Sequence, residues 1–181
     1  MVRIMAALAL AMLFAAQGAF AEDGGDPLAE AMERNPERLA ARLVDLVAGF
    51  GGPLGLTAAG IEEHIALERA AARASALRRL WAMDLDGDGT VLRAELAVSQ
   101  RAASARARGR MERQFAAADL NRDGGLDPAE MAADGQAAAL AALDEGEAAL
   151  LRASLRLDGD GDGALTADEL RAALARLDQE A

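Results

Sequence analysis

The hydrophobic positions of this chain fall into alanine- and leucine-rich stretches, separated by short segments rich in acidic residues and glycine. Alanine and leucine are strong helix formers, and residues with branched Cβ atoms are few, so the pattern favours an all-α fold. Asn35 and Pro36 supply an N-cap and a first-turn proline for a helix that is predicted to reach Ala48. Further helices are predicted over residues 58–83 (one helix or two), 92–106, 110–118, 128–142, 145–157 and 167–178, with a possible short helix from Pro27.

The first residues follow a different pattern. Arg3 precedes an unbroken apolar run from Ile4 to Ala16, and Ala19-Phe20-Ala21 matches the small-residue rule for signal-peptide cleavage. We interpret residues 1–21 as a cleaved secretory signal peptide; the alternative is an uncleaved anchor, but a membrane span needs about 20 apolar residues. No later stretch is apolar enough to span a membrane. The mature chain is therefore expected in the periplasm or outside the cell, and its lysine-free composition suggests a bacterium.

A twelve-residue pattern, D-x-[DN]-x-[DN]-G followed by five residues and Glu, occurs three times. The repeats cover residues 84–95, 119–130 and 158–169. Position 8 of each repeat is apolar, and so is the residue after each glutamate. Helix-start signals coincide with the repeat ends, because Asp127-Pro128 and Thr166 with Glu169 fit N-capping patterns. Three complete matches indicate a metal-binding loop that is repeated, and an acidic turn that binds nothing is the alternative.

The spacing suits a hard cation, which takes six to eight oxygen ligands at about 2.3–2.6 Å. Side chains at positions 1, 3 and 5 offer oxygens, position 6 needs the positive φ that glycine adopts easily, position 7 offers its backbone carbonyl, and the glutamate at position 12 can bind through both oxygens. The candidate ligands are Asp84, Asp86, Asp88, Thr90 and Glu95; Asp119, Asn121, Asp123, Gly125, Asp127 and Glu130; and Asp158, Asp160, Asp162, Ala164, Thr166 and Glu169.

These loops resemble those of the EF-hand calcium-binding superfamily, and the chain resembles bacterial exported EF-hand proteins with a calmodulin-like layout. The resemblance covers roughly residues 70–178. It implies helix–loop–helix units, here called hands, which work in pairs and bind Ca²⁺ in their loops. Three calcium ions are expected.

Because hands pair, a fourth is expected about 35 residues before the first repeat. Residues 49–60 form a Gly/Pro-rich turn with Leu56 at position 8, but Gly49, Gly51, Pro53 and Gly60 offer no side-chain oxygen at positions 1, 3, 5 and 12. We interpret this stretch as a degenerate, metal-free hand; the alternative is an ordinary connector. The resulting prediction is a polar leader (22–35) and two lobes of paired hands. One lobe is residues 36–106, with loops 49–60 and 84–95; the other is residues 107–181, with loops 119–130 and 158–169.

Charge supports the loop assignment. Acidic residues outnumber basic ones 30 to 19, which gives a formal net charge of −11, and the three repeats hold 13 of the acids and two arginines. An acidic chain disfavours nucleic acid as a partner, since phosphate binding needs clustered positive charge. Cysteine is absent and there is a single histidine, His64, which we expect to be a solvated or packed side chain. No catalytic motif is present, so an enzyme is disfavoured.

Two further features depend on the fold. Trp81, three residues before the first repeat, is expected in the core. Five arginines form a local basic stretch on helical positions: Arg101, Arg106, Arg108, Arg110 and Arg113. We interpret this stretch as a solvated face; the alternative is a site for an acidic partner.

The leading functional hypothesis is calcium binding without catalysis, as a buffer or a sensor that acts on an unidentified protein partner. A second hypothesis is a structural or interaction module that calcium holds folded. A third is binding of a trivalent lanthanide, which prefers the same oxygen donors. Lanthanide-binding relatives carry proline at loop position 2, where this chain has Leu85, Leu120 and Gly159, so the third hypothesis is the weakest.

Overall fold

A computed structural model describes residues 25–180, and the expected signal peptide lies outside the described residues. The described residues form eight α-helices, two short 3-10 helices and four two-residue strands. The helices are α1 (Pro27–Arg34), α2 (Pro36–Phe50), α3 (Ala58–Trp81), α4 (Arg93–Ser99), α5 (Ala105–Ala118), α6 (Pro128–Ala142), α7 (Glu145–Ala153) and α8 (Ala167–Glu180). The strands are β1 (Leu56–Thr57), β2 (Val91–Leu92), β3 (Gly125–Leu126) and β4 (Ala164–Leu165); η1 (Gln100–Ala102) follows α4, and η2 (Ser154–Leu157) follows α7.

The all-α prediction is confirmed, and the predicted 128–142 helix has the bounds of α6. The region between the second and third loops differs from the prediction. The 92–106 helix ends early in η1, and α5 begins at Ala105, not at residue 110. Ser104 caps α5, since its side chain accepts a hydrogen bond from the Ala107 N–H at 3.3 Å. The turn between these hands therefore lies before Ser104, and Gly109 lies inside a helix.

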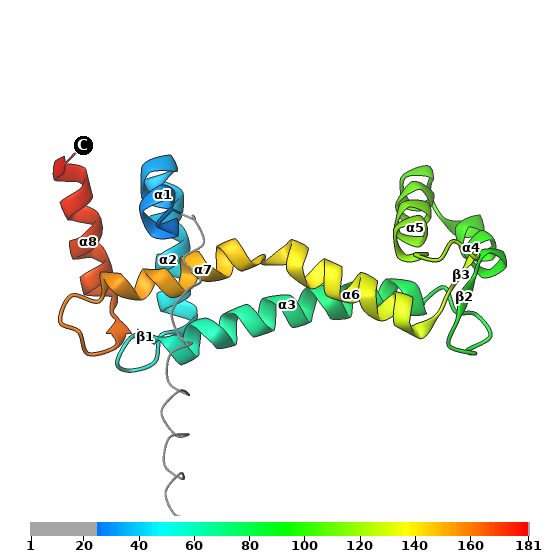
Figure 1. Ribbon diagram of the computed structural model, residues 1–181, viewed down its shortest axis with the longest axis horizontal. Coiled ribbons are helices and arrows are strands. Elements are labelled where there is room, and N and C mark those ends of the chain that lie inside the picture. The colour runs from blue at the N-terminus through cyan, green and yellow to red at the C-terminus, as the bar shows by residue number, and fades with distance from the viewer. Residues whose placement is uncertain (1–24, 181) are drawn as a thin grey trace, which may run out of the picture.

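Two long helical segments run side by side along the molecule (Figure 1). One is α3, a single helix, and the other is α6 continued by α7, which runs in the opposite direction. Gly135 allows the close approach of α6 to α3: a Cβ atom there would meet Leu77 Cγ at 3.1 Å and Arg73 Cγ at 3.2 Å. The remaining helices lie at the two ends, with α1, α2 and α8 at one end and α4 and α5 at the other (Figure 1).

The strands join the loops in an order that differs from the predicted one. β1 pairs with β4, with Leu56 opposite Leu165, and β2 pairs with β3, with Val91 opposite Leu126. The 49–60 loop therefore pairs with the 158–169 loop, and the 84–95 loop pairs with the 119–130 loop. The predicted pairing of neighbouring hands within 36–106 and 107–181 is wrong.

The length of α3 explains the difference. Its 24 residues correspond to about 36 Å at about 1.5 Å per residue. Paired strands must lie about 4.8 Å apart, so the loops at the two ends of this helix cannot pair with each other. The chain turns back at α4 and α5, and α6 with α7 returns it to the first end, where the fourth loop meets the first.

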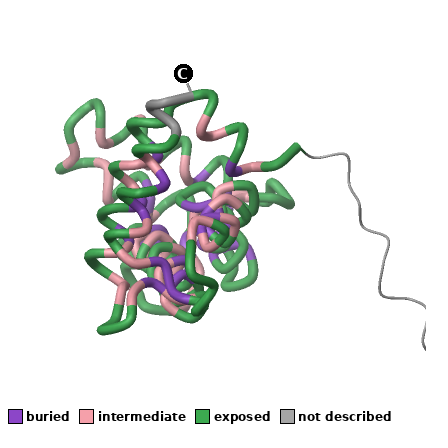
Figure 2. Tube along the Cα trace, turned by 90° about the vertical axis from the view of Figure 1, so that its left-hand side faces the viewer, coloured by how far each residue is buried: buried purple, intermediate pink, exposed green. Residues whose placement is uncertain are grey.

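Each end has its own hydrophobic core. One core joins Leu43, Leu56 and Ile61 of the first hand to Leu151 and Leu165 of the fourth. The other is built around Phe115, Leu80 and Met131 of the second and third hands. Figure 2 shows the buried residues in the interior, while much of the chain around them is exposed. Within residues 25–180, no helix is both long enough and apolar enough to cross a membrane.

Polar contacts also join the first hand to the fourth. Arg152 on α7 binds Glu62 on α3 through two hydrogen bonds, of 2.6 and 3.0 Å. Arg69 Nε donates to the Leu143 carbonyl at 2.9 Å, where α6 ends. The segment before α2 takes part as well: it contains the helix α1, whose Leu28 is buried in the core. The expected polar leader is therefore partly a packed element.

Candidate metal centre

The three repeats share one backbone conformation. The glycine at position 6 has a positive φ in each loop, namely 90° at Gly89, 86° at Gly124 and 89° at Gly163. Position 4 is also left-handed: φ is 74° at Gly87, 75° at Gly161 and 60° at Arg122. Only glycine adopts this region without a steric cost, so the third hand holds Arg122 in a strained conformation that the other two loops avoid.

The first carboxylate of each repeat organises its loop. In the 84–95 loop, Asp84 accepts hydrogen bonds from the Gly87 N–H at 2.8 Å and the Gly89 N–H at 3.1 Å. In the 158–169 loop, Asp158 accepts from the Gly161 and Gly163 N–H groups, both at 2.8 Å. In the 119–130 loop, Asp119 accepts from Asp123 at 3.1 Å and Gly124 at 3.2 Å. These bonds curve the backbone around the position-1 carboxylate. The side chains at positions 3 and 5 therefore lie around the same point as that carboxylate.

The glutamate at position 12 closes each loop. Glu95 Oε1 accepts from the Leu85 N–H at 2.7 Å, and its Oε2 accepts from the Leu92 N–H at 2.8 Å. Glu130 and Glu169 accept from the N–H groups of positions 2 and 9 of their own loops in the same way. Both oxygens of each glutamate thus reach back across the loop, as a bidentate ligand must.

Two of the loops gather their carboxylates closely. Ligand oxygens of Asp84, Asp86 and Asp88 lie within 4.8 Å of one another, and so do those of Asp158, Asp160 and Glu169. Oxygens that bind one calcium ion at about 2.4 Å can be at most about 4.8 Å apart. Both groups therefore fit a single ion of this size, although the burial of these residues ranges from intermediate to exposed.

The 119–130 loop differs at position 3. Asn121 accepts from the Asp123 N–H at 2.8 Å, while its Nδ2 donates to Asp123 Oδ2 at 2.9 Å. Among residues 25–180, groups of three acidic side chains with ligand oxygens within 4.8 Å of one another occur in the other two loops and not in this one. Here the amide of Asn121 supports Asp123, and Glu130 is buried, with 7% of its surface exposed.

Positions 7 and 9 complete the predicted donor sets. Position 7 is Thr90, which directly precedes β2, and Gly125 and Ala164, which begin β3 and β4. At position 9, Asp127 caps α6 by accepting from the Glu130 N–H at 2.8 Å, and Thr166 accepts from the Glu169 N–H at 3.2 Å. Leu92 stands at this position in the 84–95 loop, where no side-chain oxygen is available.

Electrostatics differ within the 158–169 loop. Hydrogen bonds from the N–H and the hydroxyl of Thr166, with further bonds from Gly159 and Asp160, lower the pKa of Glu169 to about 2. The pKa of Asp160 is raised: the Asp162 N–H, its strongest influence, lowers it, but desolvation together with repulsion from Asp162, Glu169 and Asp158 outweighs that bond. A cation at this point would relieve that repulsion.

Arg93, at position 10 of the first repeat, turns away from its own loop. The backbone N–H of Arg93 donates to the Gly124 carbonyl at 3.1 Å, and the guanidinium of Arg93 lies 4.5 Å from the centroid of the Phe115 ring. It also forms an ion pair of 2.5 Å with Glu112 on α5. Arg93 therefore links the second hand to the third, a role that its position next to acidic ligands did not suggest.

The 49–60 loop has the place of a hand but not its ligands. It lies between α2 and α3 and forms β1, so the interpretation as a degenerate hand agrees with its helix–loop–helix placement. Gly55, with a φ of 115°, lies against the fourth loop: a Cβ atom there would be 2.9 Å from the Leu165 carbonyl oxygen.

His64 and Trp81 are the sole histidine and the sole tryptophan of the chain, and the structure describes the surroundings of both. The His64 ring packs edge-on against Phe50, with centroids 4.8 Å apart, as expected for a packed side chain. Trp81 is 45% exposed, so the prediction that it belongs to the core is wrong. It is the last residue of α3, and Leu80 and Met83 take the core positions on either side of it.

Comparison with known families agrees with this geometry. The family described as EF hand matches at two places, residues 111–133 and 156–175. These segments contain the loops of the third and fourth hands, each with part of its flanking helices. No curated protein and no solved structure gives a significant match. The two matches support assigning the chain to the EF-hand superfamily, and they suggest calcium binding.

Proposed function

We propose that the loops 84–95, 119–130 and 158–169 each bind one calcium ion. The observation that carries the proposal is the hydrogen-bond frame common to the three loops: position 1 holds the turn, and both oxygens of position 12 reach back to positions 2 and 9. This frame, with two close groups of carboxylates, suits a hard cation with oxygen ligands.

The proposed ligands are the side chains at positions 1, 3, 5 and 12 of each loop, with the carbonyl of position 7. Asp127 and Thr166 add an oxygen at position 9. In the 119–130 loop, Asn121 would turn its amide oxygen to the ion and give up its bond to Asp123. The 49–60 loop would bind none, and its role would be to pair with the fourth loop.

The protein would act without catalysis, outside the cytoplasm after removal of residues 1–21, as a calcium buffer or sensor. A structural role is a second candidate, because the loops contribute strands to both ends of the fold. An ion bound only by the folded state at 100 times its dissociation constant adds about 2.7 kcal/mol to the free energy of unfolding. Calcium that merely holds the hands folded would show this stabilisation without exposing new apolar surface.

Isothermal calorimetry on residues 22–181 with calcium tests the proposal, and magnesium and lanthanum serve as comparisons. We expect three calcium ions per chain, and two in each of the variants Glu95→Gln, Glu130→Gln and Glu169→Gln. Four ions in the unaltered chain would show that the 49–60 loop binds, and unchanged binding in all three variants would refute the ligand assignment. Dye binding with and without calcium then separates a sensor, which exposes apolar surface, from a buffer or a structural module.

A further inference from the structure

The helix α1 lies outside the four hands and packs mainly on α2 and α7. These are the helices that enter the loops of the first and fourth hands, and α3 and α5 are the corresponding entering helices of the second and third hands. Between α3 and α5, together with α6, the structure has a cavity of about 860 Å³, which Met83, Ala107 and Met111 help to line. One pair of entering helices is therefore covered by α1, while the other pair borders a cavity.

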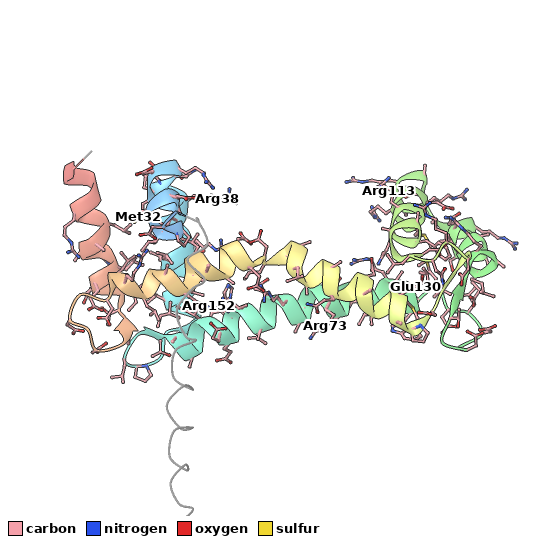
Figure 3. The ribbon with its side chains drawn as sticks, viewed as in Figure 1. Met32, Arg38, Arg73, Arg113, Glu130 and Arg152 are labelled. Atoms are coloured by element: carbon pink, nitrogen blue, oxygen red, sulfur yellow. The ribbon has the colours of Figure 1, made fainter. Side chains whose placement is uncertain are left out.

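One apolar face holds α1 in place. Leu28 is 4% exposed and belongs to the same core as Leu39 of α2 and Leu151 of α7. Ala31 and Met32, three and four residues further on, lie on the same face of the helix and are partly buried against this core. Figure 3 shows Met32 on α1, at the end of the molecule that also holds α7 and α8. If α1 moved away, apolar side chains of α2 and α7 would lose their cover.

Few polar contacts tie α1 to the hands. In the described part of the chain, the ion pair that does so joins Arg156 of η2 to Asp26, the N-cap of α1. Both side chains are about half exposed, at 55% and 42%, so water and salt weaken this pair. The ion pair of Glu30 with Arg34 lies within α1 itself. The attachment of α1 therefore depends mainly on the packing of Leu28 and its neighbours.

The connection to α2 lets α1 move without disturbing α2. Asn35 is the single residue between the two helices. Its side chain accepts a hydrogen bond from the Arg38 N–H at 2.9 Å, and Pro36 occupies the first turn of α2. These start signals belong to α2 and would remain if α1 left. Because α1 has only eight residues, it is too short to be stable as an isolated helix in water, so it would unfold as it detaches.

We propose that α1 is a detachable cover of the first and fourth hands. It opens about Asn35 while the two hands stay paired, and it then exposes the apolar surface of α2 and α7. The closed chain blocks this surface with its own helix, so an apolar helix of a partner protein would have to compete with α1 to reach it. The inference goes beyond calcium binding and does not depend on the proposed metal sites.

Native-state hydrogen exchange on residues 22–181 tests whether α1 opens by itself. The measurement is made in chelator, so that it does not involve calcium. We expect the helical amides of α1 to be protected at least tenfold less than those of α2, because a local opening is more frequent than unfolding of the whole end. Equal protection of the two helices would mean that α1 leaves only when the hands unfold, and it would overturn the proposal.

A variant with the cover open tests what lies beneath it. Leu28→Asp should detach α1, because a charge cannot be buried there without a partner. Ala29→Asp is the matched control, since it places the same charge on the next residue, which is exposed. Spin labels at Glu33→Cys on α1 and Ala149→Cys on α7, two exposed positions, report the distance between the helices, and the chain has no cysteine of its own.

We expect Leu28→Asp to lengthen and broaden the label distances and to raise the fluorescence of an apolar dye at least threefold, while Ala29→Asp changes neither. The nuclear Overhauser contact between the backbones of Leu56 and Leu165 should persist, because the hands stay paired. Unchanged label distances, loss of that contact in Leu28→Asp, or an equal effect of Ala29→Asp would each overturn the proposal. These substitutions touch no proposed ligand, so calcium titration of the same variants tests the metal sites separately.

Discussion

Leu56 lies directly opposite Leu165 across the β1–β4 pair, and both side chains are fully buried. One belongs to a loop without acidic ligands, and the other occupies position 8 of the last acidic loop. The first hand therefore supports the fourth, although 108 residues lie between Leu56 and Leu165.

Replacing Leu56 with alanine should lower the free energy of unfolding by about 2–5 kcal/mol, because it leaves a cavity between the first and fourth hands. Thermal denaturation measures the change. Leu54, in the same loop, is 73% exposed and serves as the control; Leu54→Ala should cost less than about 0.5 kcal/mol. Equal effects of the two substitutions would contradict the pairing of these hands.

The second and third loops should bind calcium as a coupled pair. Val91 faces Leu126 across β2 and β3, and Arg93 joins the two hands further. Coupling between linked sites is typically about 1–3 kcal/mol, so Glu95→Gln should weaken binding at the 119–130 loop about fivefold or more. Binding at the 158–169 loop should stay unchanged.

Resolving these sites requires a residue-specific signal. Calcium titrations followed by NMR through the amides of Gly89, Gly124 and Gly163 report each loop separately. Glu169→Gln is the matched control, because its partner loop carries no ligands and both other sites should keep their affinity. A weakened 158–169 site in the Glu95→Gln variant, with an unaffected 119–130 site, would mean that the second hand couples to the fourth, and it would contradict the β2–β3 pairing.

Acid should weaken the calcium-free fourth hand in a defined pH window. The pKa of Glu169 falls from 4.5 to about 2 on folding, because the N–H and hydroxyl of Thr166 hold its charged form. A lowered pKa means that the contribution to stability is fully present above about pH 4.5 and is lost as the pH falls through about 2. Thr166→Val removes the hydroxyl bond of 2.7 Å, so the pKa should rise toward 4.5.

NMR titration of the glutamate side chains in chelator checks this shift. Thr90→Val is the control, and it should leave the pKa of Glu95 unchanged. The hydrogen bonds that lower this pKa come from the backbone of Leu92, Leu85 and Asp86. An unchanged Glu169 pKa in the Thr166→Val variant would show that the hydroxyl contributes nothing.

Arg122→Gly should stabilise the calcium-free chain, by about 1 kcal/mol or less. Arg122 has a φ of 60°, a conformation that costs a residue with a Cβ atom about 1–2 kcal/mol, and the larger backbone entropy of unfolded glycine offsets part of the gain. The opposite exchange at the same loop position, Gly87→Ala, should destabilise by about 1 kcal/mol. Urea denaturation of both variants gives the two signs, and a loss of stability in Arg122→Gly would mean that its side chain makes a stabilising interaction.

The loops and most helices could be predicted from the sequence because what defines them is local. Twelve consecutive residues set the spacing of the candidate ligands, and capping residues such as Asp127 and Thr166 mark where the next helices begin. One helix start was predicted wrongly although its signal is local, since Ser104 caps α5 and the helix begins at Ala105, five residues before the predicted start at residue 110.

The arrangement of the hands depended on the tertiary structure. Whether residues 58–83 form one helix or two was open in the sequence, and that choice decides which loops can meet. As one continuous helix, α3 holds the first and second loops at opposite ends. Gly135 then lets α6 return along α3 and bring the fourth loop to the first. The pairing of Leu56 with Leu165 and the close packing of α6 on α3 arise from contacts between residues distant in sequence, which no local pattern encodes.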